Sequence, residues 1–326
     1  MKRMLGLLLA ASALAQEPRL SHARIERQAL IGTLDATMRD LMNKAQGPEW
    51  AAYAAPAIAG QHETCGHWLE GRGNVAASGP VLLEGPALVL ILFRLENHAV
   101  DKIRVYAIDC ELDAGGLPVH LIQGVTAEAG VSYLETLTAS HKSALMAIAM
   151  HAGTAADRAL DRLASPQQPE KTREEVAFWA GSARGAAGVQ LLKKMARSDP
   201  SERVRDKVMF GLSISKDPGA VPLLIASARQ DASGKVRGQA LFWLAQKAGK
   251  RETEAITKAV DEDPDLRVKK QAVFALQQLP RDEGIPLLIQ VARTNKDPQV
   301  RKQAMFWLGQ TNDPRAVKFF EDVLLK

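Results

Sequence analysis

The segment 300–306 reads Val-Arg-Lys-Gln-Ala-Met-Phe, and related copies of it begin at residues 172, 204, 236 and 268. Each copy follows the previous one by 32 residues and ends on phenylalanine. The first copy opens with Thr172, and the fourth carries Lys269 in place of arginine. A weaker copy precedes them, with Ala144, Ile148, Ala159 and Leu160 in phase. A fixed period of this length is the signature of a repeat array.

Each repeat contains two apolar runs of helical length, separated by turn-forming residues such as Ser198-Asp199-Pro200. The second run keeps its phase, with apolar pairs at 191–192, 223–224, 255–256, 287–288 and 319–320. These runs predict a pair of antiparallel helices in each repeat. One pair cannot bury both of its apolar faces, whereas stacked pairs share a continuous core. The predicted fold is mainly α, with an α-solenoid of about six 32-residue helical pairs over residues 137–326.

The repeat resembles the HEAT repeat, specifically the short HEAT-like bacterial form also found in phycobilisome-lyase-type proteins. The segments that carry the resemblance are Asp199-Pro200 with Val204-Arg205, Asp263-Pro264 with Val268-Lys269, and Asp297-Pro298 with Val300-Arg301. The resemblance implies that the helix bearing Val-Arg lines the concave face of the array. It also implies a ladder between repeats, made by an aspartate and an arginine six residues apart.

The ladder positions hold Arg173, Arg205, Arg237, Lys269 and Arg301, with Asp199, Asp231 and Asp263 as the acidic members. The fifth repeat departs from this spacing, because Asn295 is in phase and Asp297 stands two residues later. We expect a structural role for the arginines, since a partly buried guanidinium needs a carboxylate partner. A basic track that binds an anionic ligand is the alternative.

The repeated phenylalanines are the candidate partner-binding residues. On a helical wheel with about 100° per residue, the motif's valine, alanine and leucine mark the buried side, and phenylalanine falls almost opposite. This predicts an exposed column with Lys270 and Lys302 among its neighbours; its members are Phe178, Phe210, Phe242, Phe274 and Phe306. Exposed aromatic patches commonly mark interaction sites. The alternative is that the rings pack between neighbouring helices as part of the core.

The residue after each phenylalanine alternates in size along the array. Trp179, Trp243 and Trp307 alternate with Gly211 and Ala275. We expect the tryptophans to be lateral core residues. Their alternation with small residues indicates a packing rhythm of two repeats.

The chain begins with Met-Lys-Arg, an apolar run from Met4 to Ala11 and the sequence Ala13-Leu14-Ala15. This order is typical of a secretory signal peptide, residues 1–15, with cleavage after Ala15. We therefore expect a periplasmic or secreted protein. No apolar run reaches the roughly 20 residues that span a bilayer, so no transmembrane segment is expected.

The chain has two cysteines, Cys65 and Cys110. In an oxidising compartment they are expected to form a structural disulfide. A metal site at His62, Cys65 and His67 is the weaker alternative, because no second ligand cluster completes a tetrahedral set.

Residues 16–136 predict a small α+β domain with a β-hairpin. An amphipathic helix is expected from Ile25 to Ala45, before Gly47-Pro48. The β-rich segments from Ala87 to Glu96 and from Lys102 to Cys110 flank the loop 97–101 and predict the hairpin. Residues 109–116 begin like a calcium loop but carry Ala114 where glycine is required, so a turn is expected there.

Charge differs between the two parts of the chain. Residues 140–326 hold 31 lysines and arginines against 22 acidic residues, whereas residues 16–139 hold 9 against 15. The basic charge of the repeats favours an anionic partner, such as an anionic protein, a glycan or the chain's own N-terminal domain. Nucleic acid is not expected, because the signal peptide directs the chain out of the cytoplasm.

The chain contains no G-x-S-x-G, H-E-x-x-H, Walker or glycine-rich dinucleotide motif. We therefore expect no catalytic residues, no cofactor and no bound metal. The predicted function is a non-catalytic protein-binding scaffold or adaptor of the periplasm or cell exterior, acting through the concave face of the HEAT array. The alternatives are a bilin lyase-like HEAT enzyme and, with less support, a HEAT-like DNA-binding protein.

Overall fold

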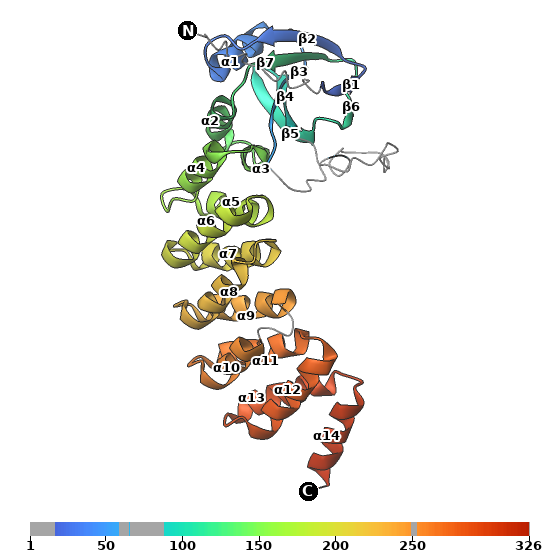
Figure 1. The fold of residues 1–326 in the computed structure, drawn as a ribbon, viewed down its shortest axis with the longest axis vertical. Coiled ribbons are helices and arrows are strands. Elements are labelled where there is room, and N and C mark those ends of the chain that lie inside the picture. Colours follow the sequence, from blue (N-terminus) through green and yellow to red (C-terminus); the bar gives the residue numbers. More distant parts are fainter. Residues whose placement is uncertain (1–16, 59–64, 66–87, 249–252, 326) are drawn as a thin grey trace, which may run out of the picture. The chain divides into compact units, whose positions relative to one another are not determined.

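A computed structural model describes residues 17–58, 65, 88–248 and 253–325 (Figure 1). The chain divides into two compact units between Ala156 and Asp157. The predicted signal peptide 1–15, the residues His62 and His67, and Ala87 at the start of the first predicted strand lie outside the described residues. In the described ranges, no helix combines the length and the apolar character needed to cross a membrane.

The first unit is built on a five-stranded mixed sheet with the order β2-β7-β3-β4-β5. Its strands are β2 (Arg24–Ala29), β3 (Glu49–Pro56), β4 (Leu88–Glu96), β5 (Ala99–Ala107) and β7 (Pro118–Gln123). Strand β4 is antiparallel to β3 and β5, whereas β7 runs parallel to β2 and β3. The hairpin predicted for this region is the β4–β5 pair.

The turn of this hairpin is shorter than the predicted loop 97–101. Only Asn97 and His98 lie between the strands, with φ values of 53° and 58°. Two-residue turns with both residues at positive φ match the twist of antiparallel strands, and asparagine tolerates this conformation. Strand β5 therefore begins at Ala99 rather than at Lys102.

Helices α2 (Ala127–Leu137) and α3 (Ser143–Met150) pack on one face of the sheet, and α1 (Leu34–Lys44) packs beside α2. The ring of Phe93 on β4 lies 5.5 Å from that of Tyr133 on α2, measured between centroids. His151, just after α3, is fully buried and places its Nε2 atom 3.1 Å from the hydroxyl oxygen of Tyr53 on β3. These contacts hold α2 and α3 in the first unit, although the array is predicted to begin at residue 137.

The prediction of one helix from Ile25 to Ala45 is wrong in its first part. Residues 24–29 form β2, which pairs in parallel register with β7, as in Arg24 opposite Pro118. Gly32 then has a φ of +72°, and α1 begins only after the N-cap Thr33. The local apolar spacing does not reveal a partner strand about 90 residues further along the chain.

A short second sheet folds over the other face of the main sheet. It consists of β1 (Arg19–Ser21) and β6 (Glu111–Asp113), which lie just before β2 and β7 in the chain. Leu20 and Leu112 pack against a buried cluster that includes Leu92 and Val119. The predicted disulfide is present close by, since Cys65 is bonded to Cys110, a member of the same cluster.

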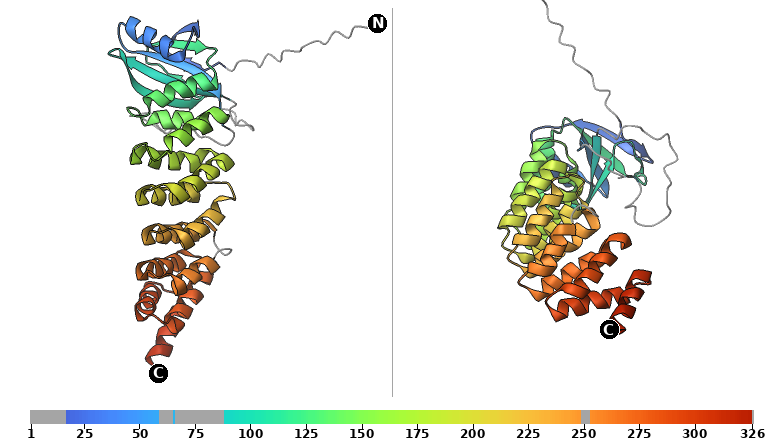
Figure 2. Two further views of the ribbon diagram at one scale, coloured as in Figure 1. Left: turned by 90° about the vertical axis from the view of Figure 1, so that its left-hand side faces the viewer. Right: turned by 60° about the horizontal axis from the view of Figure 1, so that its bottom comes forward.

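The second unit is an array of helix pairs stacked in sequence order (Figure 2). The helix α4 (Thr154–Leu163) comes before five complete pairs. The helices that carry the motif, here called the first helices, are α5 (Glu170–Ala183), α7 (Glu202–Ile214), α9 (Gly234–Ala248), α11 (Leu266–Gln278) and α13 (Pro298–Gly309). The second helices are α6 (Gly185–Ser198), α8 (Ala220–Gln230), α10 (Thr253–Glu262), α12 (Arg281–Thr294) and α14 (Pro314–Leu324).

Short polar side chains start several of these helices. Ser201 accepts a hydrogen bond from the Val204 backbone N–H at the start of α7, and Asp297 accepts one from Gln299 at the start of α13. The motif valines are buried, for example Val204 and Val300, and so are the alanines and leucines of the same face. The predicted mainly α fold, a helical repeat array after a small sheet-containing region, is confirmed.

Candidate interaction surface of the repeat array

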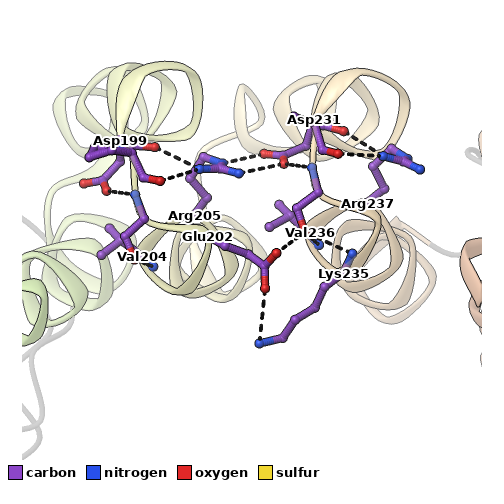
Figure 3. Close-up of polar contacts among 12 residues, drawn as sticks. Asp199, Glu202, Val204, Arg205, Asp231, Lys235, Val236 and Arg237 are labelled. Carbon is purple, nitrogen blue, oxygen red and sulfur yellow. Dashed lines mark hydrogen bonds and ion pairs between the residues drawn. The ribbon is translucent and has the colours of Figure 1, made fainter.

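Three arginines of the first helices each reach an aspartate in the loop of the following repeat, and each such pair is here called a rung. Figure 3 shows the rung between Arg205 and Asp231. In each rung Nε and Nη2 of the arginine donate to the two carboxylate oxygens of one aspartate. The N–O distances are 2.8 and 3.1 Å for Arg173–Asp199, 2.8 and 3.1 Å for Arg205–Asp231, and 2.7 and 2.9 Å for Arg237–Asp263. This is the bidentate geometry that makes arginine–carboxylate pairs strong.

Each rung also closes the loops that it joins. Nη1 of Arg205 donates to the backbone oxygen of Asp199 at 3.0 Å, and Asp231 accepts the backbone N–H of Ser233 at 2.8 Å. The hydrogen bond to Asp231 raises the pKa of Arg205, as Asp263 does for Arg237. Nε and Nη2 of these arginines are already bonded to aspartate. The geometry therefore favours the structural role of the arginines over a basic track that binds an anionic ligand.

The fourth rung is broken. Lys269 and Asn295 occupy its two positions, but Nζ of Lys269 donates to the Asp261 backbone oxygen at 2.8 Å instead. Asn295 donates from Nδ2 to Oδ1 of Asp261 at 2.9 Å and still accepts the Asp297 backbone N–H at 3.0 Å. Asp261 lies outside the repeat's aspartate position, so the motif gives no signal for its role. Arg301 closes its own loop through the Asn295 backbone oxygen, at 2.8 Å.

The motif phenylalanines and the neighbouring tryptophans form one continuous chain of ring contacts, here called the aromatic stripe. Centroid distances along it are 4.8–6.2 Å. Along the stripe the order is Trp179, Phe178, Phe210, Trp243, Phe242, Phe274, Trp307 and Phe306. Aromatic pairs at such distances contribute about 0.5–1.5 kcal/mol beyond the area that they bury.

The stripe alternates between two kinds of helix contact. Phe178 stacks on Phe210, and Phe242 stacks on Phe274, at interplanar angles of 15° and 1°. Between these stacks, Trp243 and Trp307 each lie against the phenylalanine of the preceding first helix.

The small residues in the same position explain the alternation. A Cβ on Gly211 would lie 2.4 Å from the Ala177 backbone oxygen, so α7 approaches α5 too closely for any side chain there. Ala275, which is fully buried, takes the equivalent place on α11. The size of this one residue thus sets a two-repeat rhythm: a small residue lets the helices close and phenylalanines stack, and tryptophan fills a wider gap.

Most phenylalanine rings of the stripe are less exposed than the helical wheel predicts. Phe178, Phe210, Phe242 and Phe274 are half-buried, because each ring packs on a ring of the neighbouring repeat. Phe306 is 53% exposed. The wheel considers one helix alone and therefore leaves out these neighbours. The stripe combines packing between repeats with an exposed edge.

Cations lie beside the stripe. Nζ of Lys207 is 5.3 Å from the centroid of Phe210, within the range of a cation–π contact. Lys302 is exposed on α13, and Lys270 on α11 donates to Oε1 of Gln299 at 2.9 Å. The end of the stripe near Phe306 is therefore apolar, accessible and basic.

The HEAT-repeat sequence profile matches residues 156–245 and 253–326, together just over half of the chain. The chain therefore belongs to the HEAT-repeat family. No curated protein matches the chain in sequence.

Two solved structures are similar to the chain at low identity. Human deoxyhypusine hydroxylase, in complex with glycerol, is 17% identical over 61% of this chain and 80% of its own, with a TM-score of 0.33. YibA from E. coli is 23% identical over 52% of this chain and 64% of its own, with a TM-score of 0.35.

Proposed function

We propose that this protein is a non-catalytic scaffold of the periplasm or cell exterior whose HEAT array binds a protein partner through the aromatic stripe. The observation that carries the proposal is the continuous stripe ending in Phe306, a large aromatic side chain left 53% exposed. Interfaces concentrate binding energy in aromatic side chains surrounded by weaker contacts. Among the described residues, no feature of the stripe favours bilin transfer or DNA binding instead.

The charge near Phe306 indicates the chemistry of the partner. Lys302 is exposed one helical turn before Phe306, and Lys270 occupies the same place in the preceding repeat. A partner segment with an apolar side chain next to carboxylates would complement this end of the stripe. Rim charges of this kind mainly affect the association rate, so binding should weaken as ionic strength rises.

The experiment is affinity capture from envelope extracts with the wild-type chain, Phe306→Ser and Val317→Ser. Val317 on α14 is a matched control because it is also apolar and 53% exposed, but outside the stripe. We expect a partner that the wild type and Val317→Ser retain and that Phe306→Ser loses. Binding of that partner, once purified, should weaken about tenfold or more in Phe306→Ser.

The proposal fails if every captured protein remains bound to Phe306→Ser and to the triple variant Phe210→Ser/Phe242→Ser/Phe274→Ser. Because the three central rings are half-buried, the triple variant must first show the wild-type helical content by circular dichroism. Phe306→Ser needs little such control, since its ring is the most exposed of the five phenylalanines.

A further inference from the structure

The first unit contains a hollow of about 350 Å³ on the side of the main sheet opposite α2. Its floor comes from side chains of β4, β5 and β7 that alternate with those facing the helices, such as Leu92, Tyr106 and Val119. Leu20 of β1 and Leu112 of β6 form the opposing wall. A volume of this size is at the lower end of small-molecule sites, which span roughly 300–1,000 Å³.

The apolar lining of the hollow is only partly covered. Leu92, Tyr106 and Val119 are buried, but Leu20 and Leu112 are only partly buried, although they pack against the same cluster. A ligand with an apolar body would complete the burial of this wall, and removing its apolar surface from water favours binding.

Basic side chains gather at one side of the hollow. Arg94, Lys102 and Arg104 line it from β4 and β5, and in the register of these strands Arg94 lies opposite Lys102. The carboxylate that also lines it, Asp113, accepts hydrogen bonds from the Gly115 backbone N–H and from His22. The hollow therefore has an excess of positive charge.

Arg94 and Arg104 differ in their ion-pair partners. Arg94 forms ion pairs with Glu96 at 3.2 Å and with Asp101 at 3.4 Å. Arg104, by contrast, has neither a hydrogen bond nor an ion pair with any residue that the structure describes. It is half-buried, and its charge acts to lower the pKa of Tyr106, which burial raises overall. A guanidinium in this position presents a donor pair that suits a carboxylate or phosphate group.

We propose that this hollow binds a small single-chain amphiphile, with its apolar body against Leu92, Leu112 and Val119 and its anionic head group on Arg104. The site belongs to the first unit, so it goes beyond the scaffold function and does not depend on the aromatic stripe. Charge complementarity selects the occupant: a neutral or cationic head group would leave the Arg104 guanidinium without its partner.

The test is isothermal titration calorimetry of the full chain with octanoate, octyl phosphate, octanol and octylamine at mildly alkaline pH. The four probes share one apolar body and differ in head group. We expect octanoate or octyl phosphate to bind about tenfold or more tightly than octanol, and octylamine to bind most weakly. Whichever anion binds more tightly identifies the head group as carboxylate or phosphate.

Two variants assign the site. Arg104→Gln should weaken anion binding about tenfold and leave octanol binding unchanged. Arg39→Gln is the matched control, because it removes the same charge from α1, where its partner is the exposed Asp35 outside the hollow. Circular dichroism of both variants checks the fold. Equal binding of all four probes, no binding of any, or anion binding that Arg104→Gln leaves unchanged would each overturn the proposal.

Discussion

At the level of single residues, each rung joins a first helix to the loop of the following repeat. Arg205 donates from Nη1 to the Asp199 backbone oxygen in the loop before α7 and from Nε to the Asp231 side chain in the corresponding loop of the next repeat. Asp231 in turn accepts the backbone N–H of Ser233 in its own loop. Breaking such a buried pair by removing one partner costs about 3–5 kcal/mol, because the other charge is left uncompensated. Loss of either partner should therefore destabilise the array and weaken the register between neighbouring repeats.

The broken fourth rung offers a direct test of this interpretation. In the double variant Lys269→Arg/Asn295→Asp we expect a restored rung and a gain of about 1–2 kcal/mol in unfolding free energy. Asn295→Asp alone should destabilise by about 1 kcal/mol, because it replaces a donor to Asp261 with a second carboxylate. Urea unfolding of the four proteins in this cycle, followed by circular dichroism, measures the coupling. Additive effects of the two substitutions would contradict a rung at this position.

At the level of the helix pairs, α5 and α7 approach each other very closely. A Cβ on Gly181 would lie 2.1 Å from the Gly211 backbone oxygen, and backbone cannot move aside as a flexible side chain can. Gly309 on α13 occupies the same position in the fifth repeat, and a Cβ there would meet nothing within 4 Å. The same residue thus has a packing role in one repeat and none in another.

We therefore predict opposite effects for one substitution at these two positions. Gly181→Ala should destabilise the chain by about 2–3 kcal/mol by forcing α5 and α7 apart. Gly309→Ala should be neutral or stabilise by up to about 1 kcal/mol, because alanine favours helix more than glycine does. Thermal unfolding of both variants compares them with the wild type. A cost at Gly309 similar to that at Gly181 would show that helix spacing is not the cause.

The elements also show how far sequence reasoning reaches. The array could be predicted because each of its contacts recurs every 32 residues, so Val204 and Val300 report the same buried environment. Strand β2 could not, since its partner β7 lies about 90 residues away and the apolar spacing of residues 25–45 imitates one helix. Strand β3 was missed for a related reason: the alanines Ala51 and Ala52 are buried there but have low β-propensity.

The candidate site was only partly predictable for the same physical reason. The positions of the stripe follow from the repeat period, but the exposure of its rings depends on residues of the neighbouring repeats. Phe306 is more exposed than Phe274, although both occupy one position on the helical wheel. No repeated sequence pattern marks the hollow of the first unit, because Leu92 and Arg104 are brought together only by the pairing of β4 with β5.

At the level of the whole molecule, two features indicate the compartment in which the chain folds. Residues 1–15 predict export, and Cys65 is bonded to Cys110. Disulfides persist in oxidising compartments and are rare in the cytosol. Linking residues separated by 45 positions restricts the unfolded chain and contributes about 3–4 kcal/mol in the chain-entropy account.

Removing residues 1–15 should therefore prevent both the export of the chain and the formation of its disulfide. With residues 1–15 present in a bacterial host, we expect a periplasmic protein that begins at Gln16 and has no free thiol. A chain started at Gln16 behind an initiating methionine should stay in the cytosol with both cysteines reduced. Mass spectrometry of the intact proteins, with and without thiol alkylation, measures both outcomes.

The variant Cys65→Ser/Cys110→Ser separates the two causes, because it should still be cleaved and exported while its first unit unfolds at lower denaturant concentration. An uncleaved, reduced product from the full-length chain would contradict the exported location.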